Sequence, residues 1–154
     1  MPTYTHEWLC QQIVDNAGDA IIFADPSGII RLWNAGAEAM FGYRAEEALG
    51  HTLDLIIPEH LRERHWAGYR KAMTTGVTRY SQELLAVPAR RKDGTRLSLE
   101  FSVVMLHQAS GELLGVAAII RDVTVRWQRD RALKERLAAL EAHVRHAGAP
   151  PGEG

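Results

Sequence analysis

The chain has 154 residues, 46% of them hydrophobic, and a formal net charge of −1; these values fit one soluble globular domain with short flanks and give no field that would attract nucleic acid or an anionic membrane. The single cysteine, Cys10, excludes an internal disulfide and a multi-cysteine zinc site, and it fits a reducing compartment. No basic segment with an apolar run opens the chain and no stretch reaches the length of a membrane span, so we expect a cytoplasmic protein that does not enter a membrane.

The first third of the chain predicts a helix followed by a β-hairpin. Thr5 is placed to cap a flanking helix that ends near Gly18. Residues 20–24 and 29–33 have the length and apolar content of strands, and Asp-Pro-Ser-Gly at residues 25–28 has the composition of a turn. These two strands are therefore expected to pair in antiparallel fashion.

Two short helices and one long helix are expected next. Asn34 is placed to cap a helix over residues 35–41, and residues 44–49 form another short helical turn; each is followed by a glycine. Pro58 suits a first helical turn and Gly76 suits a left-handed C-terminal cap. The segment between them predicts a single central helix.

The central helix has an unusual face. Four of its positions recur at spacings of four, three and four: Leu61, His65, Gly68 and Ala72. An amphipathic helix usually carries Leu, Ile or Phe on such a stripe, whereas this one carries an imidazole followed by little side-chain volume. We expect the face to leave room for a flat ligand, with Trp66 and Tyr69 off to the side. A surface or core role for His65 remains the alternative.

After Gly76 the pattern becomes extended. Residues 78–91, 95–107 and 113–123 predict three strands, separated by turns at residues 92–94 and 109–111. The element order is then strand, strand, helices, strand, strand, strand. This order predicts an α+β fold with a five-stranded antiparallel sheet and its helices gathered between the second and third strands.

From Arg126 the chain is helical and highly charged. Its apolar positions form a heptad seam: Leu133, Leu137, Leu140 and Val144. Because only about two heptads are present, an isolated helix of this kind would be marginal. We expect a homodimer contact, with packing on its own domain as the alternative. Residues 148–154 predict a disordered tail.

Several segments, in the correct order, resemble a PAS domain. They are residues 19–25, 30–34, 37–43, 47–50, 91–94 and 120–124. The resemblance implies an N-terminal flanking helix (1–18), a PAS sensor domain (19–124) and a C-terminal signalling and dimerisation helix (125–147). It also implies a sheet with short helices on one face, a cleft between the sheet and the central helix, and signalling through the flanking helices.

The central helix also resembles that of the FixL-type oxygen-sensing kinases of rhizobia, in which a histidine of this helix is the axial ligand of a b-type haem. Counting without gaps from Gly76 and from residues 91–94 places His65 at that ligand position. The resemblance thus implies a haem b sensor of a diatomic gas (O2, CO or NO) or of redox state, with His65 as the iron ligand.

The same resemblance implies the surroundings of the haem. A neutral imidazole donates a lone pair to iron and leaves the sixth position open. Small residues would give the macrocycle space, apolar strand residues would exclude water, and basic residues would meet the propionates. The residues expected around the cofactor are His65, Gly68, Tyr69, Lys71, Ala72, Arg79, Leu85, Leu99, Phe101 and Ile119.

Two positions depart from the FixL pattern. Trp66 stands where Asp commonly follows the ligand, and Leu85 stands where an arginine holds bound oxygen. Without that donor the oxygen complex loses a hydrogen bond of about 1.5–3 kcal/mol, which makes CO and NO the better candidate ligands. Met73 and Met105 are candidates for the sixth position, although packing is their expected role.

Other functions remain open at this point. The reactive cysteine of light-sensing flavin domains would lie just after Gly50, where His51 and Thr52 stand, so a photoadduct is excluded. A non-covalent flavin, with Trp33 and Asn34 near the cleft, and a cofactor-free dimerisation or interaction module are the alternatives. Because no nucleophile–base pair, metal-spacing motif or phosphate loop is present, we expect no enzyme activity and a signal that passes to a separate signalling protein.

Overall fold

The computed structural model describes residues 1–78 and 85–148, and the side chains of residues 85 and 86 lie outside this description. The chain forms two compact units, residues 1–122 and 123–154. The first unit contains the sheet and all the shorter helices. The second contains one long helix.

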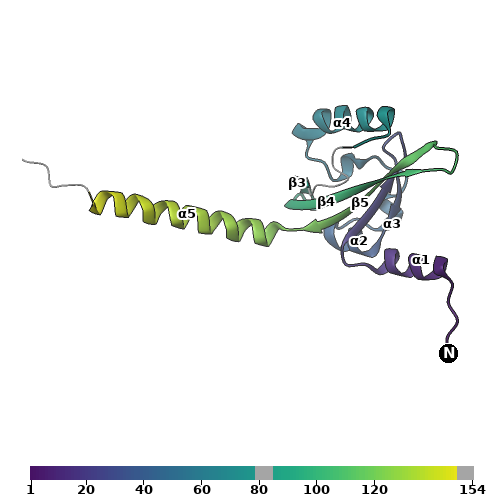
Figure 1. Ribbon diagram of the computed structural model, residues 1–154, viewed down its shortest axis with the longest axis horizontal. Helices are drawn as coiled ribbons and strands as arrows, with labels where there is room; N and C mark the ends of the chain where they lie inside the picture. Colours follow the sequence, from purple (N-terminus) through teal and green to yellow (C-terminus); the bar gives the residue numbers. More distant parts are fainter. Residues whose placement is uncertain (79–84, 149–154) are drawn as a thin grey trace, which may run out of the picture. The chain divides into compact units, whose positions relative to one another are not determined.

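The first unit is built on a five-stranded sheet of order β2-β1-β5-β4-β3, in which all neighbours pair in antiparallel fashion (Figure 1). The strands are β1 (Ala20–Ala24), β2 (Ile30–Trp33), β3 (Leu85–Arg90), β4 (Arg96–His107) and β5 (Leu113–Asp122). The predicted α+β class with a five-stranded antiparallel sheet is therefore confirmed.

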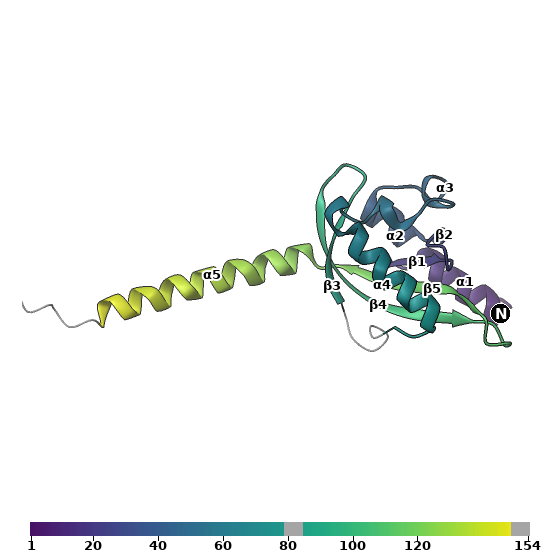
Figure 2. The same ribbon diagram turned by 90° about the horizontal axis from the view of Figure 1, so that it is seen from above.

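Helix α1 (His6–Asn16) precedes the sheet, and the other helices of this unit fall between β2 and β3. These are α2 (Ala35–Phe41), α3 (Ala45–Ala48), the 3-10 turns η1 (Leu53–Leu55) and η2 (Glu59–Leu61), and α4 (Arg62–Thr75). Figure 1 shows α4 as a separate layer beside the sheet, and in Figure 2 it overlies β4 and β5. The two views thus place α4 over this part of the sheet.

The hydrophobic core lies between one face of the sheet and helices α2 and α3. Alternate strand residues point into it, because successive side chains of a strand alternate between its faces. The buried members include Ile22 of β1, Phe41 of α2, Leu97 and Leu99 of β4, and Ile120 of β5. Helix α4 contributes no fully buried residue to this core.

One buried amide joins three elements of the fold. Asn34 is 4% exposed, and its Oδ1 accepts the N–H of Ile21 at 2.8 Å and that of Ala37 at 2.9 Å. Its Nδ2 donates to the carbonyls of Val14 at 2.8 Å and Asp19 at 3.1 Å. A buried polar side chain must satisfy its hydrogen bonds, and Asn34 does so by tying the end of α1, strand β1 and the start of α2 together.

The second unit contains helix α5 (Thr124–Ala147), which at 1.5 Å per residue is about 36 Å long. The four residues of its heptad seam are each more than half exposed. Within residues 1–78 and 85–148, no helix is both long enough and apolar enough to cross a membrane.

Candidate functional site

Helix α4 carries the candidate ligand, and local chemistry sets its ends. Gly76 adopts φ 70°, and its N–H donates to the carbonyl of Ala72 at 2.8 Å, which is the left-handed cap expected there. The start differs from the expectation of one continuous helix from Pro58. The first turn is the separate 3-10 turn η2, and the α-helix begins at Arg62.

Polar contacts hold the first half of α4 to the rest of the unit. The indole Nε1 of Trp66 donates to Oδ1 of Asp54 at 2.7 Å, and the hydroxyl of Tyr69 donates to the backbone carbonyl of Asp25 at 2.5 Å. Arg62 donates to the carbonyl of Asp54 at 3.2 Å. The helix is therefore attached to η1 and to the β1–β2 turn.

Trp66 and Tyr69 do not lie off to the side but share the half-buried side of the helix with Leu61, His65 and Ala72. The predicted inward face was therefore wrong in leaving out the two aromatic residues and in including Gly68. Trp66 packs on Gly28 so closely that a Cβ built on that glycine would overlap ring atoms Cζ3 and Cη2. Gly68, which was expected to provide space for a cofactor, is exposed, and a Cβ added to it would meet no neighbouring segment within 4 Å. The physical reason is that aromatic side chains with distant partners, rather than the small residues, determine which face turns inward.

His65 lies beside these aromatic rings. Its ring centroid is 4.8 Å from that of Trp66 in an edge-on arrangement and 5.8 Å from that of Tyr69. Its Nδ1 is buried and has no hydrogen-bond partner in the part of the chain that the structure describes. Burial lowers the pKa of His65, and the carboxylate of Asp54 opposes this effect. The imidazole is therefore neutral near pH 7, which is the form that binds metals.

The predicted strand residues separate into two faces. Leu99 is 3% exposed and Phe101 is partly buried against the core. Ile119 is 40% exposed and pairs with Ser102 and Ile21, so it lies on the opposite face of the sheet from the buried Ile120. Its predicted place in the wall of the cofactor pocket was therefore wrong, because a shift of one residue along a strand reverses the face.

The remaining predicted residues have varied positions. Lys71 is exposed and Ala72 is half-buried on α4. Leu85 pairs with Phe101 at the start of β3, but its side chain lies outside the described part of the chain. Arg79 also falls outside the described residues. The structure thus brings His65 and Tyr69 together. The predicted contacts of Lys71 and Arg79 with the propionates, and of Leu85 with the bound gas, stay predictions.

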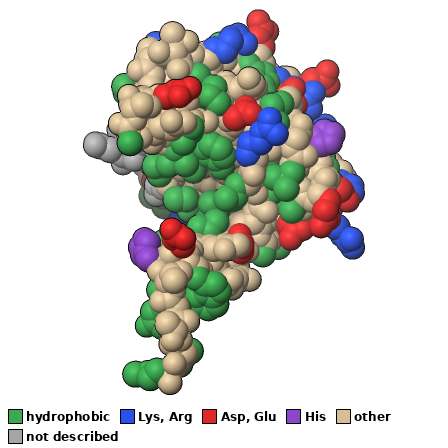
Figure 3. Space-filling view, turned by 90° about the vertical axis from the view of Figure 1, so that its right-hand side faces the viewer, with side chains coloured by type: hydrophobic (Ala, Val, Ile, Leu, Met, Phe, Trp, Pro, Cys, Tyr) green, Lys and Arg blue, Asp and Glu red, His purple; other side chains and the backbone are tan. Residues whose placement is uncertain are grey.

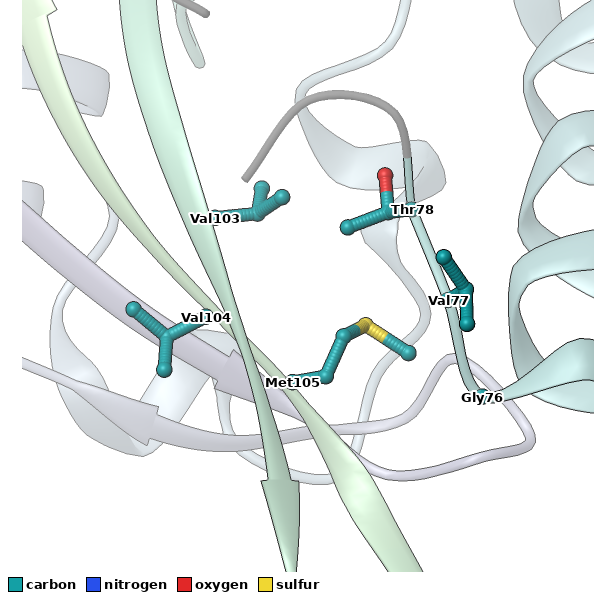
Figure 4. A pocket seen from close by; sticks show the side chains of 6 residues that line it. All are labelled: Gly76, Val77, Thr78, Val103, Val104 and Met105. Atoms are coloured by element: carbon teal, nitrogen blue, oxygen red, sulfur yellow. The ribbon is translucent and has the colours of Figure 1, made fainter. Parts of the chain in front are cut away.

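A pocket that the sequence did not suggest lies at the far end of α4. It has a volume of about 320 Å³ and is lined by Gly76, Val77, Thr78, Val103, Val104 and Met105. Figure 4 shows Met105 extending toward Val77, whereas Val104 points away. Gly76 is 11 residues beyond His65, about 16 Å along a helix axis. The alternating apolar pattern of β4 revealed an inward face but could not show that, among the described residues, part of this face lines a pocket.

The surface adds one observation. Figure 3 shows apolar side chains gathered on one face of the molecule with few charges among them.

Among the residues that the structure describes, no three His, Cys, Asp or Glu side chains are grouped so that they could hold a metal ion. Axial ligation of a haem iron needs a single protein side chain on one side, so a lone imidazole such as that of His65 is sufficient for it.

The sheet order, with its helices inserted between the second and third strands, defines the class of the domain. The family model described as PAS fold matches residues 14–128, about three quarters of the chain. The chain therefore belongs to the PAS family, as its sequence motifs indicated.

Two characterised sensor proteins are similar in sequence. The sensor protein FixL of Bradyrhizobium diazoefficiens is 31% identical over 140 residues, which cover 91% of this chain and 27% of FixL. The oxygen sensor protein DosP of Escherichia coli is 27% identical over 148 residues, which cover 88% of this chain and 18% of DosP. The chain thus spans less than a third of the length of these relatives. The predicted resemblance to FixL-type sensors is confirmed.

A solved structure described as an RNA-binding light-oxygen-voltage receptor is also similar. It superposes with a TM-score of 0.71 and is 25% identical, over 90% of this chain and 39% of that one. The similarity supports the PAS fold of the first unit.

Proposed function

We propose that this PAS domain is a sensor that holds haem b through His65 and responds to a diatomic gas or to redox state. The observation that carries the proposal is the buried Nδ1 of a neutral imidazole that has no partner among the described residues. A buried nitrogen without a partner is unfavourable, so the described fold does not account for this imidazole; the other ring nitrogen, Nε2, is the one that we expect to bind the iron. The resemblance to FixL-type sensors, in which a histidine of this helix binds haem, supports haem as the bound group, and the similarity to the oxygen sensor protein DosP supports a gas as the signal.

Residues of this chain can perform each task that such a sensor needs. His65 supplies the lone pair, the partly buried Phe101 presents apolar surface on the core face of β4 beside the buried Leu99, and exposed Lys71 offers a cation for a propionate. A bound haem supplies an iron whose remaining axial position takes O2, CO or NO. Because Leu85 offers no hydrogen-bond donor, we propose that CO and NO bind better than O2.

The test is an absorption spectrum of protein expressed with a supply of haem. We expect a Soret band in the native protein, no such band in His65→Ala, and its return in His65→Gly when free imidazole is added. His60→Ala is the matched control, because His60 lies just before α4 and is exposed. A Soret band that survives His65→Ala, or a protein that takes up no haem, would refute the proposal.

Flavin is the second candidate. The similar structure is described as a light-oxygen-voltage receptor, and the light-sensing PAS domains considered in the sequence analysis bind flavin. The residues expected near such a flavin have structural roles here. The indole of Trp33 is buried and donates to the carbonyl of Tyr43 at 3.0 Å, and Asn34 uses both ends of its amide within the fold. A flavin band in the same spectrum would support this candidate, and a featureless spectrum would favour a cofactor-free interaction module.

We also propose that α5 joins two copies of the chain and that the signal passes to a separate signalling protein. The exposed seam from Leu133 to Val144 supports the first part, since a helix with an unpartnered apolar stripe is marginal in water. In this proposal the domain senses without catalysing a reaction, and it works in the cytoplasm.

A further inference from the structure

We infer that Trp66 and Tyr69 are positioning residues, which lock α4 to η1 and the β1–β2 turn and thereby hold His65 in place. We call these two side chains and their distant partners the lock. The inference rests on the proposed function only for the role that it gives the lock, which is to position the iron ligand. The lock itself is a property of the protein alone, so it can be tested without any cofactor.

Polar contacts matter for helix α4, and besides those of Trp66 and Tyr69 only its first residue, Arg62, adds side-chain hydrogen bonds toward the preceding segment within the described part of the chain, to the carbonyls of Asp54 at 3.2 Å and Ile57 at 3.1 Å. None of its residues is fully buried, so apolar burial contributes less to its placement than to that of α2. The hydrogen bonds of Trp66 and Tyr69 instead reach residues 12 and 44 positions away in the sequence. A helix held in this way will separate from the sheet locally when such a bond is lost.

The β1–β2 turn has a shape that complements the indole of Trp66. Gly28 adopts φ 82°, a conformation that side-chain-bearing residues rarely adopt, and it has no Cβ where the indole lies. The neighbouring Tyr69 stays protonated, because burial raises the pKa of its hydroxyl. Its bond to the carbonyl of Asp25 therefore persists over the whole physiological pH range.

The two aromatic rings also confine the imidazole. Trp66 and Tyr69 are one and four positions beyond His65 on the same helix, and their rings contact each other at 5.3 Å between centroids. Each lies within 6 Å of the His65 ring. With both rings fixed by distant partners, His65 has few rotamers available. Trp66 thus takes a structural role at the position where FixL-type proteins commonly carry Asp.

Hydrogen exchange of the cofactor-free protein tests the lock. In Asp54→Ala and Tyr69→Phe we expect the amides of α4 to exchange about fivefold faster, the effect of losing one hydrogen bond, while those of β4 and β5 are unchanged. Asp54→Asn should match the native protein, because its amide oxygen still accepts the Trp66 N–H. The ion pair between Asp54 and Arg62, at 3.9 Å and partly exposed, adds little to this comparison.

Tyr4→Phe is the matched control, since Tyr4 is exposed near the N-terminus. Faster exchange along the whole chain would show general destabilisation and overturn the inference, as would unchanged exchange in α4 or equal effects of Asp54→Asn and Asp54→Ala. The outcome is separable from that of the haem proposal. If the protein binds no haem but the variants show the selective change in α4, the inference about the lock stands and the proposed function falls. If the protein binds haem but exchange in α4 is unchanged, the proposed function stands and the inference about the lock falls.

Discussion

Oδ1 of Asn34 accepts the backbone N–H of Ile21 at 2.8 Å, so the start of α2 and strand β1 share one buried acceptor. We expect Asn34→Ala to lower the free energy of unfolding by about 2–4 kcal/mol, because it leaves several buried backbone groups unpaired. Urea denaturation measures the change. Asn16→Ala, at an exposed position near the end of α1, is the control and should cost far less; equal losses would contradict this role for Asn34.

Gly28 and Gly50 offer a matched pair of alanine substitutions. Both have a left-handed backbone, with φ of 82° and 86°, but a Cβ added to Gly28 would overlap the indole of Trp66, whereas a Cβ added to Gly50 would meet no atom within 4 Å. We expect Gly50→Ala to cost about 1–2 kcal/mol from backbone strain and Gly28→Ala to cost about 1–3 kcal/mol more from overpacking. Chemical denaturation gives both values. Equal costs would show that the turn does not need to accommodate the indole.

The carboxylate of Asp25 makes the stability of the turn depend on pH. Burial acts to raise the pKa of Asp25, but the N–H groups of Ile29 and Ser27 and the guanidinium of Arg31 outweigh it and hold the pKa below 3.8. A carboxyl group whose pKa is lower in the folded than in the unfolded state stabilises the fold at pH values above its unfolded-state pKa. This stabilisation is lost as the pH falls through the folded-state pKa.

We therefore expect the native protein to be more stable than Asp25→Asn at pH 7 and about pH 5, with the difference disappearing toward about pH 2. Urea denaturation at each pH measures it. The other carboxylates titrate in both proteins and cancel in the difference. A gap that is constant with pH would assign the effect to the geometry of the turn rather than to its charge.

The seam of α5 predicts the oligomeric state. Leu137→Glu places a charge in the centre of the exposed stripe, so we expect the proposed homodimer to dissociate into monomers in sedimentation equilibrium. Ala138→Glu, one position off the seam, should leave the dimer intact. A native protein that is monomeric at all concentrations would remove the basis for this contact.

Signals that act within a few residues were predictable from the sequence. Thr5, Asn34 and Gly76 cap their helices as expected, because capping is determined by the cap residue and its nearest backbone groups. The hairpin and the three later strands likewise follow from short apolar runs and their turns. The combined pattern was sufficient for the PAS fold.

Which side of helix α4 packs against the rest of the domain could not be predicted in this way. Periodicity places residues on a common face but does not say which face turns inward, and here the decision depends on Asp25 and Gly28 of a distant turn. The same limit explains Ile119, which belongs to an apolar run in β5 but points away from the core. Trp66 was treated as a departure from a pattern, although its size was a signal that it needed a partner.

The pocket near Met105 and the imidazole of His65 lie toward opposite ends of one helix, about 16 Å apart along its axis. A competition assay that reports displacement from His65 will therefore miss small molecules that settle beside Met105. Compound screening on this domain needs a probe at each end, such as the Met105 methyl resonance alongside the visible spectrum.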